Sequence, residues 1–167
     1  WALFLRIKMQ PQVIEGDILD QDVDVIINPW NRNIIPWWLL LPQGVSCAIK
    51  RRGGNQPFKD LAKMGAIPLG QARETNCPGL GFKSIIHVAG INLCWFATAR
   101  SVADSVRNAV QIINNQDYKS AAFPLIGAGS GNRSADWSLT IMQRTFASLE
   151  SDANIIIVRY VKNRVNN

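Results

Sequence analysis

The hydrophobic residues of this chain follow two patterns, short continuous runs rich in β-branched side chains and stripes at helical spacing. Residues 23–27 and 84–88 are runs of the kind expected for strands that are buried on both faces of a sheet. The same pattern predicts further strands over residues 2–9, with a short continuation at 12–15, over 121–126 and over 154–161.

Two long helices are predicted from apolar stripes. Residues 98–115 place Val102, Val106 and Ile113 on one face and leave charged residues on the other. Residues 134–149 carry a similar stripe.

Two shorter helices are predicted from their boundary residues. The first covers residues 45–52 and ends at Gly53-Gly54, since glycine readily adopts the positive φ of a helix C-terminus. The second covers residues 57–64, with Asn55 as its cap and Gly65 as its stop.

Helices that alternate with apolar strands indicate an α/β fold, a three-layer α/β/α sandwich around a mixed, mostly parallel sheet. No repeat or linker interrupts the pattern, so we expect a single domain over residues 1–167 with its core at about 13–161. Ligands bind such sheets outside the carboxyl ends of the strands. The loops after Ile27 and Ile126 are therefore the places to search for a site.

Composition adds limits to this picture. Of the 167 residues, 47% are hydrophobic and 18% charged, as in globular proteins. No apolar run approaches the roughly 20 residues that span a bilayer, and the start of the chain does not resemble a signal peptide, so we expect no membrane partner. Cys47, Cys77 and Cys94 lack metal-ligand or CxxC spacing, which favours reduced thiols, a cytoplasmic protein and no metal or cofactor.

The formal charge of +6 favours a polyanionic partner, from nucleotides to nucleic acid. Five basic residues fall in one stretch: Lys50, Arg51, Arg52, Lys59 and Lys63. They indicate either a nucleic-acid-binding patch or the solvated faces of two helices.

Polar residues at two loops suggest contacts to a nucleoside. Asp17, in the turn Gly16-Asp17-Ile18, could accept a hydrogen bond from an exocyclic amine such as that of adenine, with the backbone of Ile18 at the ring edge. Asn31 could bind ribose hydroxyls. Each also fits an ordinary turn, in which Asp17 binds its own backbone and Asn31 adopts a left-handed conformation.

Two glycine-containing loops are suited to phosphate. Gly44 precedes a predicted helix, whose free N–H groups and dipole attract anions. Gly127, Gly129 and Gly131 alternate after a strand and could form a backbone nest, with the Ser130 hydroxyl as a further donor, or a plain flexible loop. Neither loop has the spacing of a P-loop or a Rossmann motif, so a diphosphate fits but phosphoryl or hydride transfer does not.

The order of these motifs resembles the macrodomain family. The matching segments cover residues 16–18, 28–31, 44–50, 53–54, 85–88 and 124–131. The resemblance implies a cleft for ADP-ribose or an ADP-ribosylated macromolecule. It implies these contacts: Asp17 and Ile18 at adenine with Tyr160 beside it, Asn31 near the distal ribose, and Gly44, Val45, Ser46, Gly127, Ala128, Gly129, Ser130, Gly131 and Asn132 around the diphosphate and ribose.

Some members of this family only read ADP-ribosylation, and others hydrolyse ADP-ribosyl or O-acetyl-ADP-ribose bonds. The MacroD-type hydrolases carry an Asp where this chain has Ser46. A hydroxyl is a poor general base, so Asn31 and Ser46 are candidate catalytic residues without a strong base between them. The resemblance implies a structural role for His87. A nucleic-acid-binding module is the alternative from another class.

An apolar insertion, residues 34–41, separates Asn31 from Ser46. It could cover the distal ribose, line a pocket for a substituent, form a dimer surface or pack onto the core of its own domain.

Overall fold

The computed structural model describes residues 8–39, 44–129 and 131–161. Its centre is a six-stranded sheet in the order β1-β6-β5-β2-β4-β3. The strands are β1 (Gln12–Gly16), β2 (Val25–Trp30), β3 (Ala72–Thr75), β4 (Ser84–Ala89), β5 (Ser120–Pro124) and β6 (Asn154–Tyr160). All neighbouring strands are parallel except β3, which is antiparallel to β4.

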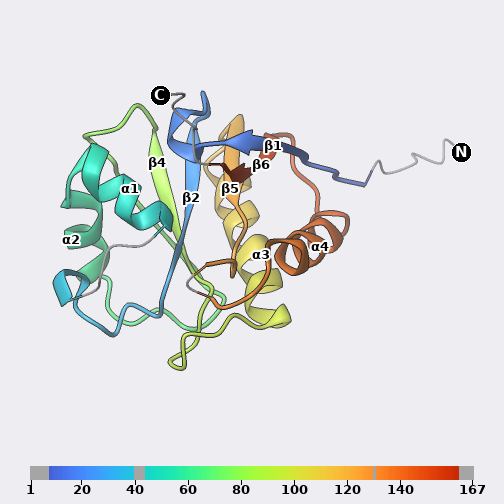
Figure 1. The fold of residues 1–167 in the computed structure, drawn as a ribbon. Helices are drawn as coiled ribbons and strands as arrows, with labels where there is room; N and C mark the ends of the chain where they lie inside the picture. The colour runs from blue at the N-terminus through green and yellow to red at the C-terminus, as the bar shows by residue number, and fades with distance from the viewer. Residues whose placement is uncertain (1–7, 40–43, 130, 162–167) are drawn as a thin grey trace, which may run out of the picture.

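Helices cover both faces of the sheet. The helices are α1 (Gly44–Gly53), α2 (Gln56–Ala62), α3 (Ala99–Asn115) and α4 (Ala135–Phe146), with short 3-10 turns η1 (Ile18–Asp20) and η2 (Trp37–Leu39). Figure 1 shows α1 and α2 on one side of the sheet and α3 and α4 on the other. The predicted three-layer α/β fold with a mixed, mostly parallel sheet is confirmed.

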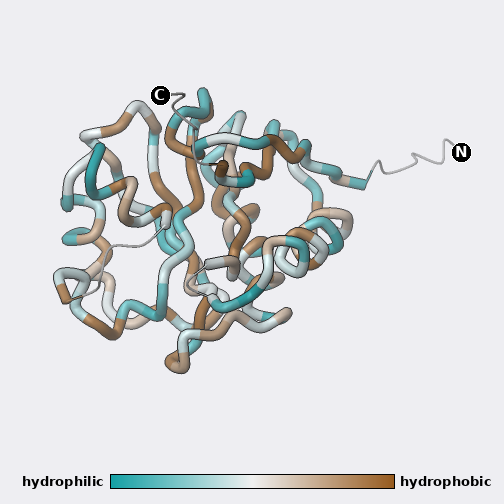
Figure 2. Tube along the Cα trace, in the orientation of Figure 1, coloured by the Kyte–Doolittle hydropathy of each residue, from teal (hydrophilic) through white to brown (hydrophobic). Residues whose placement is uncertain are grey.

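Alternation along the strands divides the apolar side chains between two cores. Ile27 and Phe123 pack with α3 and α4, whereas Ile26 packs with α1 and α2. The central strands are accordingly the most hydrophobic segments in Figure 2. Phe123 and Phe146 meet edge to face with ring centroids 5.0 Å apart. Full burial of one such side chain stabilises the fold by about 1.5–3 kcal/mol.

The predicted boundaries of the helices are mostly confirmed. Thr98 caps α3 in a capping box with Ser101, and Gly65 has the positive φ of a helix stop, +75°. Asn55 is the N-cap residue of α2, as expected, and its carbonyl accepts the N–H groups of Phe58 and Lys59, but its side chain makes no capping bond.

Several strand boundaries differ from the prediction, and one strand was missed. The strand predicted at 2–9 is not present at Lys8 and Met9, and residues 2–7 lie outside the described ranges. β3 was missed because its sequence, Ala-Arg-Glu-Thr, has no apolar run. β5 ends at Pro124, two residues before the predicted end.

β2 runs through Pro29 to Trp30, three residues further than predicted. The Trp30 carbonyl accepts the Gly90 N–H on the β4 side. Successive residues of a strand direct their polar groups to opposite sides, so Pro29 faces the β5 side, where pairing stops at Ile26. Proline lacks an N–H, but no strand of the described residues pairs with Pro29 on that side, so no sheet hydrogen bond is lost.

The direction in which the chain crosses the sheet reverses between β2 and β5. β2 leads through α1 and α2 towards β4 on one side, and β5 leads through α4 to β6 on the other. Parallel sheets bind ligands at such switch points. That residues 1–167 form a single domain stays a prediction. Within the described ranges, no helix is long and apolar enough to cross a membrane.

Candidate ligand-binding cleft

The first edge of the cleft is the turn after β1. Gly16 lies opposite Tyr160 in the sheet, which brings Asp17 and Tyr160 to neighbouring strand ends. Asp17 caps η1 because its Oδ1 accepts the Leu19 N–H at 2.9 Å. The backbone N–H of Ile18, the first residue of η1, follows directly on Asp17 in the chain. The turn therefore presents a carboxylate acceptor next to a backbone donor.

Asp17 is also held from α1. Arg52 donates from Nη2 to Asp17 Oδ2 at 2.9 Å and from Nη1 to Asp20 Oδ1 at 2.7 Å. Its pKa is raised, chiefly by the hydrogen bond to Asp20. Asp17 is thus a turn residue that binds nearby backbone, as one of the two interpretations of the sequence predicted. Its carboxylate is nevertheless partly exposed and can be reached by a ligand.

The loop after β5 forms the second edge. Gly127 and Gly129 have φ of +88° and +81°, and Asn132 has +56°, conformations that L side chains rarely adopt. A Cβ on Gly131 would lie 2.4 Å from the Gly127 carbonyl oxygen, so only glycine fits there. The N–H groups of Ala128 and Asn132 donate to Leu125 O at 3.2 Å and Gly129 O at 3.0 Å, which holds the loop in this shape. Left-handed residues that alternate with right-handed ones turn N–H groups to one side, as in anion nests. Ser130 lies outside the described residues.

Contacts to the loop after β4 fix this glycine loop. The Ala97 N–H donates to Gly131 O at 3.1 Å, and Asn132 Nδ2 donates to Trp95 O at 3.0 Å. Arg133 Nε donates to Ala97 O at 2.9 Å, and its guanidinium lies 4.7 Å from the centre of the Trp137 ring. A fixed cation thus borders the loop on the α4 side.

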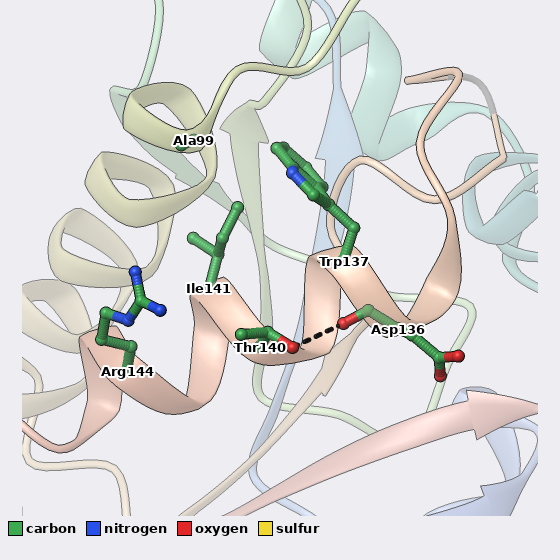
Figure 3. A pocket seen from close by; sticks show the side chains of 6 residues that line it. All are labelled: Ala99, Asp136, Trp137, Thr140, Ile141 and Arg144. Atoms are coloured by element: carbon green, nitrogen blue, oxygen red, sulfur yellow. Dashed lines mark hydrogen bonds between the residues drawn. The ribbon is translucent and has the colours of Figure 1, made fainter.

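Trp137 also supports the loop from behind. A Cβ on Gly127 would lie 3.6 Å from Trp137 Cζ3 and 2.7 Å from Ala97 Cβ. A surface pocket of 420 Å³ lies beside Trp137 and is lined by Ala99, Asp136, Trp137, Thr140, Ile141 and Arg144. Trp137, Ile141 and Arg144 point from one face of α4 towards α3, while Asp136 points away (Figure 3). No glycine is among the residues that line this pocket, unlike the β5 loop.

The start of α1 supplies the third edge. Gly44 has a φ of +56°, and no atom of the described residues lies within 4 Å of a Cβ placed on it. Val45 and Ser46 are half-buried in the first turn of the helix. The positive end of the helix dipole lies here and favours an anion.

Asn31 follows β2 beside that helix. Its Oδ1 accepts the Asn33 N–H at 2.6 Å, and Asn33 has a φ of +59°. The oxygen of the Asn31 amide is therefore engaged in the turn. A neutral amide does not remove a proton from water, so Asn31 can contribute only by hydrogen bonding.

His87 is a structural residue, as expected. It is fully buried, and desolvation lowers its pKa to about 3. Its Nδ1 lies 3.0 Å from Asn28 Nδ2, so Nδ1 accepts and the neutral ring donates from Nε2 to Thr75 Oγ1 at 2.8 Å. A neutral, enclosed histidine does not serve as an acid or base for a ligand in the cleft.

The apolar insertion after Asn31 divides into buried and exposed parts. Trp37 packs against the α1–α2 core and its ring centroid lies 5.9 Å from Lys50 Nζ, whereas Trp38 is 67% exposed. The prediction that the insertion packs onto the core of its own domain is therefore confirmed for Trp37. Trp38 is exposed and can contact a ligand or partner. Leu40 and Leu41 lie outside the described residues.

The basic stretch is partly used within the fold. Lys50 is enclosed by Trp30, Trp37 and Phe58, and this desolvation lowers its pKa. Arg52 is paired with Asp17 and Asp20. These contacts reduce the charge free for a polyanion.

Two functional candidates were missed at the sequence level. Arg52 was assigned to a general basic patch, because its partner Asp17 is 35 positions away. Arg133 directly follows the glycine loop, and this adjacency was the signal that could have found it.

Comparisons with known proteins agree with the fold and the motifs. The family model described as Macro domain matches residues 27–142. The chain is 34% identical over 129 residues to an O-acetyl-ADP-ribose deacetylase of Klebsiella pneumoniae, covering 72% of this chain and 70% of that protein. It is 30% identical over 165 residues to a macro domain-containing protein of Listeria monocytogenes, covering 92% and 89%.

Solved structures give the same answer. A variant macrodomain of Oceanobacillus iheyensis with ADPR aligns with a TM-score of 0.77 at 25% identity, covering 91% of this chain and 85% of that one. The sequence resemblance is thereby confirmed. The chain belongs to the macrodomain family.

Proposed function

We propose that the cleft binds ADP-ribose or a close derivative, and that the protein reads or processes ADP-ribosylation. The observation that carries this proposal is the placement of a carboxylate and a backbone donor after β1 and a left-handed glycine loop after β5, at one edge of a parallel sheet. The first pair suits a purine base and the second suits phosphate.

The donor and acceptor order favours adenine as the base. Adenine presents an amine at position 6 next to an acceptor nitrogen at position 1. The Asp17 carboxylate would accept from the amine, and the Ile18 N–H would donate to the ring nitrogen. Tyr160, 70% exposed at the adjoining strand end, offers a face for stacking worth about 1 kcal/mol.

The diphosphate would lie between the glycine loop and the start of α1. Gly127, Ala128, Gly129, Gly131 and Asn132 supply the loop backbone, and Ser130 a hydroxyl. Gly44, Val45 and Ser46 supply the helix start. Arg133 adds positive charge behind the loop.

A second candidate function is hydrolysis of an ADP-ribosyl or O-acetyl-ADP-ribose bond, since the Klebsiella relative bears the name of a deacetylase. Ser46 and Asn31 would border the distal ribose. With Asn31 Oδ1 engaged by Asn33, water would be held mainly by backbone groups and substrate hydroxyls. We therefore expect slow turnover.

Calorimetry with ADP-ribose at rising salt tests the proposal. Micromolar binding that depends only weakly on salt supports it. Binding of unrelated oligonucleotides that weakens steeply with salt would instead favour a polyanion-binding module. No measurable heat with ADP-ribose would contradict both the binding and the hydrolytic proposals.

A further inference from the structure

The pair formed by Asp17 and Arg52 adds a feature to the base end of the cleft. Arg52 lies in the last turn of α1 and Asp17 in the turn after β1. The guanidinium bridges Asp17 and Asp20, so both of its terminal nitrogens are fixed by carboxylates. A planar fork held at both ends keeps one orientation, which a lysine ammonium would not.

This bridge determines what the Asp17 carboxylate can still accept. A carboxylate offers about four lone-pair sites. The Leu19 N–H occupies one on Oδ1, and Arg52 occupies one on Oδ2. The side chain keeps 24% of its surface exposed, so the remaining sites can be reached by a ligand.

The bridge also balances charge beside an anionic ligand. Asp17 and Asp20 carry two negative charges, and Arg52 offsets one of them. The proposed ligand has a negatively charged diphosphate, so removal of Arg52 would add repulsion at its base end. Added salt shortens the Debye length from about 8–10 Å at ordinary ionic strength and so weakens such repulsion between exposed charges.

We propose that Arg52 is a specificity-determining residue, which holds the Asp17 carboxylate in place to accept a purine 6-amino group and makes the cleft reject a 6-oxo purine. This rests on the proposed function. A 6-oxo purine would set its oxygen against the carboxylate and its ring N–H against the Ile18 N–H. When Arg52 holds Asp17 in place, this repulsion weakens binding of the 6-oxo base. Without Arg52, the Asp17 side chain could turn away from the oxygen and the repulsion would be smaller.

The test is calorimetry with ADP-ribose and inosine diphosphate ribose, its 6-oxo analogue. Wild-type protein should prefer ADP-ribose by at least about tenfold, the scale of one hydrogen bond to a charged group. Arg52→Ala should reduce that preference by about fivefold, mainly through weaker ADP-ribose binding, because the ion pair is partly exposed and its contribution modest. Arg52→Lys should lie between the two.

Arg51→Ala is the matched control, since Arg51 is the exposed neighbour of Arg52 in the same helix. This variant should prefer ADP-ribose over the 6-oxo analogue to the same extent as wild type. Thermal unfolding of each variant reports whether it is folded. A salt series adds a readout that a purely structural role would not change: raising salt should help ADP-ribose binding by Arg52→Ala relative to wild type.

An unchanged preference in folded Arg52→Ala and Arg52→Lys would overturn the inference. So would an increased preference, which would mean that Arg52 itself donates to an oxo base. If wild type binds both ligands equally, the inference fails while the proposed function stands. If wild type binds neither, both fail.

Discussion

Gly131 packs directly against Gly127, so closely that a Cβ on Gly131 would lie 2.4 Å from the Gly127 carbonyl oxygen. That contact closes the loop after β5 on itself. Gly131→Ala must push the two backbones apart and should weaken ADP-ribose binding by about tenfold or more, that is by at least about 1.4 kcal/mol. Calorimetry measures the loss.

Gly81→Ala is the control for that change, because nothing lies within 4 Å of a Cβ placed on Gly81 and the residue is remote in sequence from the loop. It should bind ADP-ribose as wild type does. Equal affinities for the two variants, both folded by circular dichroism, would refute a phosphate-binding role for the loop.

Arg133 should contribute to binding through both charge and anchoring. Arg133→Ala removes the cation and the contact to Ala97 O, and we expect about tenfold weaker ADP-ribose binding. Arg133→Lys keeps the charge but loses the stacked fork, so its affinity should be intermediate. Arg144→Ala, on α4 away from the loop, should have no effect. If Arg133→Ala matches it, Arg133 has no role in the cleft.

His87 should make the protein sensitive to acid. Its pKa is about 3 in the fold against 6.5 for an exposed histidine. Between these values the unfolded chain binds a proton that the folded chain does not, so stability is fully present above pH 6.5 and falls as the pH drops. The contribution to the slope is about 1.4 kcal/mol per pH unit.

Urea unfolding from pH 7 to 4 measures this effect, and His87→Gln isolates it because glutamine does not titrate there. The variant should start less stable and lose less on acidification. Parallel stability profiles for the two proteins would show that His87 is not held neutral.

Much of the architecture could be predicted from the sequence, because continuous β-branched runs and helical stripes report burial directly. The sequence pattern did not predict β3, because Arg73 and Glu74 interrupt any apolar run there. The contact between Arg52 and Asp17 joins residues distant in the chain, and local patterns carry no information about such a tertiary partner. Arg133 directly follows the glycine loop, so its position was a local signal, but its contact with the Trp137 ring depends on how the loop folds.

Ser46 sets the expected limit on catalysis. Ser46→Asp supplies a general base beside the proposed distal ribose and should raise turnover of O-acetyl-ADP-ribose or ADP-ribosylated protein by at least about tenfold. Asn31→Ala should remove what activity the wild type has, and Ser46→Ala should leave it nearly unchanged. A Ser46→Asp variant that binds ADP-ribose but turns over no faster would contradict this assignment.

The most direct measurement of the cleft is an NMR titration of labelled protein with ADP-ribose, followed at backbone amides. The largest shifts should fall at Ile18, Val45, Gly129 and Gly131, and Asp17→Ala should abolish or greatly weaken them. The amides of Glu74 and Tyr118, around a separate pocket, should stay unchanged. Saturable shifts confined to that pocket, or none at all, would contradict an ADP-ribose cleft between β1, β2 and β5.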